Sequence, residues 1–197
     1  MPKKILQRDN PVLRKTSEEV ELTQIKSPKI QKILEEMKSA MDSQDDGVAI
    51  AAPQIGHLLR IFIVSGKVKN IIDENKRTRS NLPEQNKDDK TSEPVAAKDI
   101  VFINPVIKKI SKEKKAMEEG CLSVRYLYGK VFRNHKATVE AFDQHGKKFT
   151  MGGVGLLAQI FQHEIDHLDG VLFIDKAKDL EEIPPEETPN KQNAKRS

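Results

Sequence analysis

Residues 154–170 of this 197-residue chain read VGLLAQIFQHEIDHLDG, and the fold is best approached from this stretch. Its apolar residues recur at helical spacing, at Leu156, Leu157, Ile160, Phe161, Ile165 and Leu168. Gly170 follows, at a position that commonly ends a helix. The stretch therefore predicts a helix over residues 154–168 that buries one apolar face.

The same helix carries two histidines four residues apart, His163 and His167. On a helix they project from one face, one turn apart, where two imidazoles can ligate one metal ion. Glu164 lies about 100° around the helix from His163, so its carboxylate can reach a metal-bound water without ligating the metal. Alternatively, both histidines are surface residues on a charged face. Asp166 either orients an imidazole or is simply solvated.

A catalytic metal would need one more protein ligand than these two histidines. Cys121, the only cysteine of the chain, lies in EGCLS at 119–123. Its thiolate would complete a Cys-His-His set and leave the fourth position open for water. Two other interpretations stay open: a small buried residue, or a nucleophile activated by a histidine base.

The segment GVAIAAPQIG at 47–56 is rich in small residues. Small side chains let a ligand approach the backbone closely, as pairing along an extended peptide requires. Gln54 could donate an amide hydrogen bond to a developing oxyanion. Taken alone, however, the segment is better explained as a tight turn.

The remaining patterns predict an α+β fold. The predicted elements are a helix that starts at Ser27 and Pro28, strands at 60–64 and 100–107, and a hairpin of 138–142 with 147–151. The order helix, strands, hairpin, helix is typical of α+β rather than alternating βα proteins.

Composition excludes several classes of protein. The chain has 34 Lys and Arg against 30 Asp and Glu, a net charge of only +4, and no Trp. This balance does not indicate nucleic-acid binding, and few aromatic residues are available to stack on bases. No apolar run approaches the roughly 18 residues of a membrane span, and the charged N-terminal stretch is unlike a signal peptide. The lone cysteine indicates a reducing cytosol. We therefore expect a cytoplasmic protein without a DNA or membrane partner.

Two polar segments are expected outside the core. Residues 66–98 contain eight basic and six acidic residues with no sustained apolar period, and residues 176–197 are polar and broken by proline. Such compositions bury too little apolar surface to offset the entropy of ordering. The sequence predicts a single catalytic domain over 1–175, a flexible insertion at 66–98 and a disordered tail at 176–197.

Three of these motifs together resemble the peptide deformylases. They are GVAIAAPQ at 47–54, EGCLS at 119–123 and QHEIDH at 162–167, in the order found in that family. The stretches ILQRDNPVLRK, INPVI and LDGVLFID also resemble it, so the likeness covers nearly all of the chain outside the two polar segments. It implies an α+β fold in which antiparallel sheets surround a central metal-binding helix.

The resemblance implies a metallohydrolase, a formyl-L-methionyl peptide amidohydrolase. It would remove the formyl group from the N-terminal formyl-methionine of newly synthesised proteins and release formate. Cys121, His163 and His167 would bind one divalent ion, often Fe(II) in this family, with Zn(II), Ni(II) or Co(II) as alternatives. Metal-bound water would be the nucleophile, and Glu164 would act as general base and then as general acid.

The resemblance also assigns residues to the substrate. Gln54 and the backbone N–H of Leu122 would stabilise the oxyanion. The backbone at Gly47, Val48 and Ala49 would pair with the peptide. Ala49 stands where the family has a second glycine, so it would be strained if this position required a positive φ.

Four residues after the EGCLS motif leave questions open. Arg125 and Tyr126 stand where the family usually has a proline, which puts the path of the loop to 133 in doubt. Tyr128 and Arg133 either line the peptide groove or are exposed.

Partners and alternative functions complete the hypothesis. Formyl-methionyl nascent peptides would be the substrates. Transient ribosome association stays open, because the tail lacks the C-terminal helix that contributes to ribosome docking in some members. A catalytically inactive homologue that binds peptides or the ribosome would be expected to have lost Glu164 or a ligand. An HExxH metallopeptidase would have its third ligand after the helix, whereas Cys121 precedes it.

Overall fold

The four-residue run IFIV explains the layering of the fold. In the computed structural model, which describes residues 2–68 and 98–184, this run forms β2 (Ile61–Val64) and all four side chains are buried. Ile61 and Ile63 join a core with α1 (Pro28–Asp42), whereas Phe62 and Val64 join a core with α3 (Leu156–Leu168). Since successive side chains of a strand point to opposite faces, the sheet has a helix on each side.

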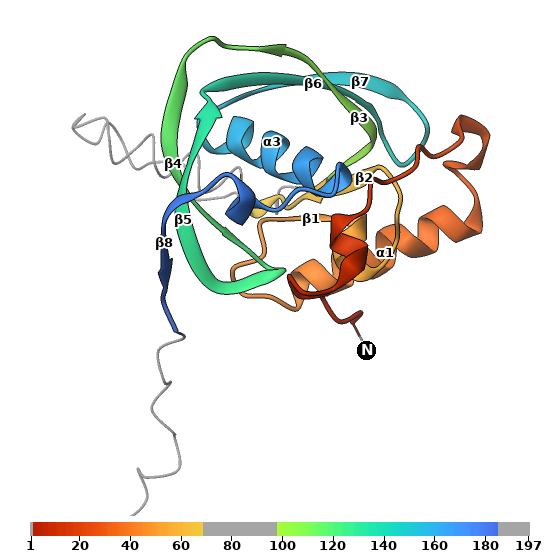
Figure 1. The fold of residues 1–197 in the computed structure, drawn as a ribbon. Coiled ribbons are helices and arrows are strands. Elements are labelled where there is room, and N and C mark those ends of the chain that lie inside the picture. The colour runs from red at the N-terminus through yellow and green to blue at the C-terminus, as the bar shows by residue number, and fades with distance from the viewer. Residues whose placement is uncertain (1, 69–97, 185–197) are drawn as a thin grey trace, which may run out of the picture.

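The described strands form two antiparallel sheets (Figure 1). The five-stranded sheet has the order β1 (Ala49–Ala51), β2, β3 (Ile100–Ile110), β6 (Lys136–Phe142) and β7 (Lys148–Val154). The three-stranded sheet has the order β4 (Lys114–Cys121), β5 (Val124–Asn134) and β8 (Lys178–Glu182). Short 3-10 helices span Pro11–Arg14, Leu22–Gln24, Ala52–Ile55 and Phe173–Asp175. α3 lies between the two sheets, which confirms the predicted fold class.

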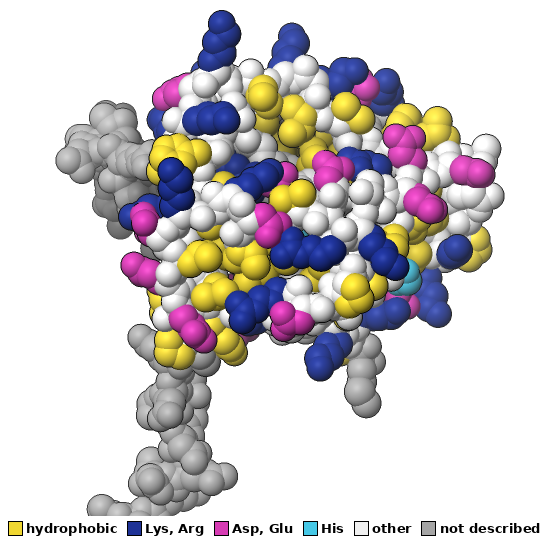
Figure 2. Space-filling model, in the orientation of Figure 1, with side chains coloured by type: hydrophobic (Ala, Val, Ile, Leu, Met, Phe, Trp, Pro, Cys, Tyr) yellow, Lys and Arg dark blue, Asp and Glu magenta, His cyan; other side chains and the backbone are white. Residues whose placement is uncertain are grey.

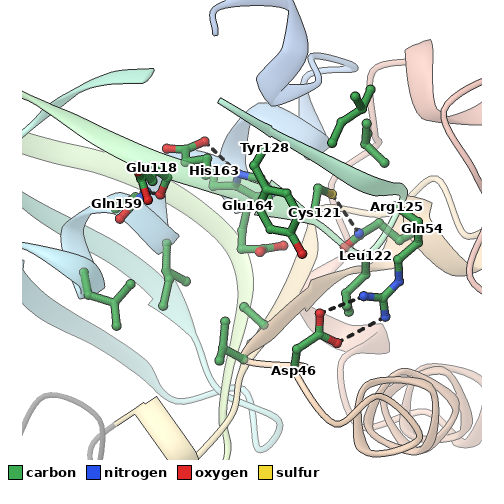
Figure 3. Close-up of a pocket in the computed structure, with 18 of the residues that line it drawn as sticks. Asp46, Gln54, Glu118, Cys121, Leu122, Arg125, Tyr128, Gln159, His163 and Glu164 are labelled. Carbon is green, nitrogen blue, oxygen red and sulfur yellow. Dashed lines mark hydrogen bonds and ion pairs between the residues drawn. The ribbon is translucent and has the colours of Figure 1, made fainter. Parts of the chain in front are cut away.

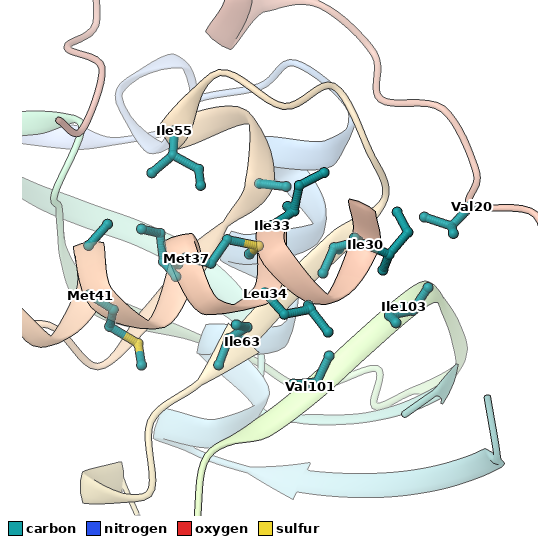
Figure 4. Packing of buried hydrophobic residues seen from close by; sticks show 14 of the residues in the cluster. Val20, Ile30, Ile33, Leu34, Met37, Met41, Ile55, Ile63, Val101 and Ile103 are labelled. Atoms are coloured by element: carbon teal, nitrogen blue, oxygen red, sulfur yellow. The ribbon is translucent and has the colours of Figure 1, made fainter. Parts of the chain in front are cut away.

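The first predicted helix, α1, is confirmed together with its start. The Ser27 hydroxyl accepts a hydrogen bond from the Ile30 N–H at 3.4 Å, and Pro28 is the first helical residue. The buried face of α1 packs on β1, β2 and β3 (Figure 4), through Ile30, Ile33, Leu34, Met37 and Met41. The cap and the apolar spacing thus act together, because the cap sets where the helix begins and the spacing sets which face is buried.

α3 is fixed on the five-stranded sheet by aromatic packing. The rings of Phe62 and Phe102 stack with centroids 4.4 Å apart, and Phe161 of α3 meets Phe102 edge-on at 5.3 Å. All three side chains are fully buried. These contacts confirm that the apolar face of this helix is buried, although the helix begins at Leu156 because Val154 ends β7.

Two glutamines attach the same helix to the three-stranded sheet. Gln159 donates to the Glu118 carbonyl of β4 at 2.8 Å. Gln162 donates to the Asn134 carbonyl of β5 at 2.9 Å and accepts from the Asn134 N–H at 3.0 Å. Buried polar groups are destabilising unless they are paired, so these bonds fix the rotation and depth of α3.

The predicted hairpin is confirmed by the pairing of β6 with β7, which begins with Phe142 opposite Lys148. The Asp143 carboxylate accepts from the N–H groups of His145 and Lys147, and Gly146 has a φ of +76°. The strands predicted at 60–64 and 100–107 are confirmed as β2 and β3. β4 was not predicted, because its sequence KKAMEEGC buries little and depends on main-chain pairing with β5.

The prediction of a disordered tail from residue 176 is wrong for residues 178–182. These residues form β8, which pairs with β5 at Leu127, Tyr128 and Lys130. An edge strand is held by main-chain hydrogen bonds and needs no apolar side chains, so the composition of residues 178–182 did not indicate a strand. Residues 185–197 and most of the predicted insertion, 69–97, lie outside the described residues. At the base of that insertion, Gly66 N–H donates to the Asp99 carboxylate at 3.0 Å.

The surface carries charges of both signs. Lysine and arginine side chains are interspersed with aspartate and glutamate over the face in Figure 2, as the near balance of charges leads one to expect. Within the described ranges, no helix is both long and apolar enough to cross a membrane.

Gly170, which follows α3, is expected to tolerate no side chain. Its φ is +75°, and an added Cβ would lie 2.7 Å from the Arg14 carbonyl oxygen. Gly170→Ala should lower the free energy of unfolding by about 2–4 kcal/mol, from backbone strain and from the clash. Gly146→Ala is the matched control, because its φ is +76° but its nearest neighbour is a flexible lysine carbon at 3.9 Å. If urea denaturation showed that the two variants lose the same free energy of unfolding, this account would be contradicted.

Candidate metal centre

Three potential metal ligands converge where the end of β4 meets α3. One ligand atom from each of Cys121, His163 and His167 lies within 4.8 Å of the others. The Cys121 sulfur is 3.2 Å from Nε2 of His167. The helical spacing of the histidines places both rings on one face, and β4 delivers the thiol to that face.

Glu119 orients one of the two imidazoles. Its Oε2 is 3.0 Å from Nδ1 of His163, so Nδ1 carries the proton and Nε2 is left to face the cluster. From the sequence, the residue considered for orienting an imidazole is Asp166. In the structure, Asp166 bonds instead to Arg133 and Lys176.

Arg133 is buried, which corrects the expectation that it lines the groove or is exposed. Only 4% of its side chain is accessible. It donates to both oxygens of Glu119, at 2.7 and 2.9 Å, and to Asp166 at 2.6 Å. Burial disfavours the Glu119 anion, but the hydrogen bonds from Arg133 and His163 outweigh this and lower the pKa of Glu119 to about 2. Arg133 therefore keeps Glu119 ionised.

Glu164 is a buried carboxyl beside the cluster. It is 4% exposed, and among the described residues its Oε2 has no hydrogen-bond partner. Burial raises the pKa of Glu164 to about 7. A carboxyl with this pKa can both accept and release a proton near neutral pH.

Gln54 lies beside the Cys121 end of the cluster. Its oxygen accepts from the Ala51 N–H at 2.8 Å, which fixes the amide so that its nitrogen points towards Cys121. That nitrogen is 3.0 Å from the Ser123 hydroxyl and 3.6 Å from the Cys121 sulfur. The backbone N–H of Ser123 also points at this sulfur, at 3.4 Å. A thiolate here is thus surrounded by donors.

A cavity of about 330 Å³ opens onto these groups (Figure 3). It is lined by Gln54, Cys121, Leu122, His163 and Glu164, by the apolar Leu156 and Ile160, and by Val48 and Ala49. Among the strands that the structure describes, β1 is the terminal strand of its sheet, so one of its backbone edges has no neighbouring strand there. Such an edge can pair with an extended peptide.

The structure places Ala49 and Tyr128, whose roles the sequence left open, at the cavity. Ala49 lies in β1 and has no positive φ, so the methyl group causes no backbone strain. Tyr128 lines the cavity, with its ring packed over Gly120, where an added Cβ would lie 2.7 Å from the ring.

The donor set fits a divalent cation. One thiolate and two imidazoles suit the transition metals, and a neighbouring free carboxyl is typical of catalytic rather than structural sites. Burial lowers the pKa of His167, which favours the neutral form that a ligand requires. Burial opposes a charge on His163, yet Cys121 and Glu119 raise the pKa of His163 well above its usual value, so a metal ion at Nε2 would have to displace a proton there. The fold and the site define a metallohydrolase.

Comparisons with known proteins identify the family. The model of the polypeptide deformylase family matches residues 2–182, and the chain belongs to this family. It is 36% identical over 167 residues to Peptide deformylase 2 of Clostridium acetobutylicum, covering 85% of this chain and 89% of that protein. It is 36% identical over 172 residues to the tomato (Solanum lycopersicum) Peptide deformylase 1A, chloroplastic, covering 87% of this chain but only 58% of that protein.

The fold comparison agrees. A crystal structure of a class I type b peptide deformylase from Acinetobacter baumannii, bound to Met-Ala-Ser, superposes with a TM-score of 0.70 at 27% identity. The match covers 89% of this chain and 98% of that one.

Arg133→Ala should be strongly destabilising, because it leaves the buried Glu119 charge without its partner. We expect the free energy of unfolding to fall by about 3–5 kcal/mol. Arg14→Ala is the control, since Arg14 pairs with Asp175 at the surface and should contribute at most about 1 kcal/mol. Similar small losses for both variants in chemical denaturation would argue against an essential buried pair.

Proposed function

We propose that this chain hydrolyses the formyl group from the N-terminal formyl-methionine of new polypeptides and releases formate. The observation that carries the proposal is the position of Glu164. Its free, buried carboxylate oxygen lies beside the three converging ligand atoms and lines the same cavity. Membership of the deformylase family supports the reaction.

In the proposed mechanism, Cys121, His163 and His167 hold one divalent ion. When bound, this ion supplies Lewis-acid polarisation and lowers the pKa of water at the site. Glu164 accepts a proton from the attacking water at its free oxygen. As the bond between the formyl carbon and nitrogen breaks, Glu164 delivers that proton to the departing amine.

Two donors are proposed to stabilise the negative charge on the formyl oxygen. Gln54 is held with its amide nitrogen towards the site by the bond from Ala51 to its oxygen. Leu122, whose backbone N–H is the second donor, is itself held by Gln7, which donates to the Leu122 carbonyl at 3.1 Å. Because both donors are already in position before the reaction, they need not reorganise when negative charge develops on the formyl oxygen.

The cavity suits an unbranched apolar side chain at the N-terminus of the substrate. Leu156 and Ile160 form an apolar wall next to the histidines, and we propose that the methionine side chain packs there. Gly47, Val48 and Ala49 would pair with the peptide backbone along the free edge of β1. The related A. baumannii enzyme binds Met-Ala-Ser, which supports a peptide with an N-terminal methionine as the ligand of this chain.

The metal and the cellular setting are also proposals. The set of one thiolate and two imidazoles suits Fe(II), and equally Zn(II), Co(II) or Ni(II). A free thiol as ligand favours the reducing cytoplasm, where nascent chains are also available. Transient association with the ribosome would bring the enzyme to its substrate.

We take residues 1–182 as the catalytic domain, since β8 completes the second sheet. The inactive alternative is not favoured, because Glu164 and all three ligands are present.

Glu164→Gln should separate metal binding from turnover. The amide keeps the shape of the side chain but cannot accept the proton, so the rate of formate release from a formyl-Met peptide should fall by at least about 10²-fold. Metal content, measured on the same anaerobic preparation, should stay near one equivalent. Wild-type activity in this variant would show that Glu164 is not the base.

Cys121→Ala should act on the metal instead. Removing the sulfur leaves two imidazoles, so the protein should lose most of its bound metal during dialysis against a weak chelator. Far-UV circular dichroism should remain unchanged, because Cys121 is only partly buried. Full retention of metal by this variant would contradict the proposed ligand set.

A further inference from the structure

A three-residue bulge shapes the cavity wall opposite β1. In the pairing of β4 with β5, Cys121 lies opposite Val124, whereas the preceding Gly120 lies opposite Tyr128. Residues 125–127 therefore have no partners in β4, and all three line the cavity. Tyr126 has a φ of +67°, which is uncommon for a non-glycine residue.

The C-terminal strand supports this bulge from its other side. Leu127 pairs with Glu182 of β8, and the Ile183 N–H donates to the Tyr126 carbonyl at 2.8 Å. A strained residue persists only where its surroundings hold it in place. β8 thus helps to keep residues 125–127 in the cavity wall.

From this bulge, Arg125 reaches the segment that leads into β1. It donates to both carboxylate oxygens of Asp46, at 2.7 and 3.2 Å, and to the Gln44 side-chain oxygen at 2.6 Å. Figure 3 shows the two side chains facing each other at the edge of the cavity. Asp46 immediately precedes the residues proposed to pair with the peptide, so the ion pair joins the two sides of the groove.

The proposed function determines the direction in which the substrate peptide runs along the groove beside this ion pair. The formyl end must lie at Cys121 and Glu164, next to Gln54. Gln54, at the end of the segment 46–54, lies 3.6 Å from the Cys121 sulfur, whereas Asp46, at its start, pairs with Arg125. A peptide that pairs with β1 and runs away from the metal ligands towards Asp46 is therefore antiparallel to β1. At about 3.3 Å per residue, a peptide whose methionine lies opposite Val48 brings its second or third residue to Asp46.

The ion pair is accessible and nearly neutral as a unit. The Asp46 side chain is 58% exposed and that of Arg125 is 27% exposed, so both can interact with a passing side chain. Among the described residues, the one other charged side chain of the cavity lining, apart from the groups of the metal centre, is Glu118 on the β4 side. Removal of either member of the pair would leave one uncompensated charge at this point.

We propose that the Arg125–Asp46 ion pair determines specificity for the residues that follow the formyl-methionine. Joined, the two side chains cancel each other's charge and let the groove accept acidic and basic residues alike. This inference rests on the proposed function, since it uses the direction of the bound peptide.

The test uses two variants with opposite effects on charge. Asp46→Asn leaves the guanidinium unpaired, and Arg125→Gln leaves the carboxylate unpaired. The kcat/KM for formate release is measured on formyl-Met peptides that differ only in Lys or Glu at the second or third position.

For the wild-type protein, kcat/KM should differ by less than about twofold between the Lys and the Glu peptides. Asp46→Asn should prefer Glu, and Arg125→Gln should prefer Lys, each by roughly three- to fivefold, the size typical of exposed ion pairs. The preferences should weaken at high salt.

Arg60→Gln is the matched control. Arg60 forms an ion pair with Asp169 of similar exposure, 17% and 48%, and neither residue lines the cavity. For this variant, as for the wild type, kcat/KM should differ by less than about twofold between the Lys and the Glu peptides. If Asp46→Asn and Arg125→Gln alter KM equally for Lys and Glu peptides, the pair is merely structural and the proposal is wrong.

A binding measurement separates this proposal from the proposed function. The product-like peptides Met-Ala-Lys and Met-Ala-Glu are titrated into the metal-loaded variants by calorimetry, without turnover. Opposite charge preferences in the two variants would support the specificity role even if formate release were absent, in which case only the proposed reaction would fail. Identical affinities in all variants would overturn the specificity role, whatever the activity.

Discussion

The structure depends on the placement of one helix between two sheets. α3 carries His163, Glu164 and His167, and these groups are useful only if the helix faces the thiol at the end of β4. Aromatic packing holds one side of α3, and bonds from Gln159 and Gln162 to strand carbonyls hold the other. The fold therefore sets the geometry of the site through the rotation and depth of this helix.

Much of the fold could be predicted from sequence, because the decisive elements bury a regular apolar pattern. α1 and α3 show helical spacing, and β2 is apolar throughout because both of its faces are covered. β4 and β8 escaped prediction, since exposed strands depend on main-chain pairing, which depends little on side-chain type. The bulge after Val124 arises from pairing register, which one strand's sequence does not specify.

The site was predicted through residues with local spacing or recognisable motifs, and the structure brings Cys121, His163 and His167 together. The groups that support them were harder to find. Arg133 lies far along the chain from His163, and its bonds to Glu119 exist only once β4, β5 and α3 are assembled. The sequence signal for the Arg133–Glu119 pair would be an arginine on one strand and a glutamate on the neighbouring strand. This combination is also common at protein surfaces.

X-ray absorption spectroscopy of the zinc-loaded protein tests the central claim most directly, because it reports the atoms around the metal. We expect one sulfur at about 2.3 Å and two imidazole nitrogens at about 2.0–2.1 Å, with the sulfur scattering lost in Cys121→Ser. A first shell of nitrogen and oxygen alone in the wild-type protein would contradict a centre built from Cys121, His163 and His167.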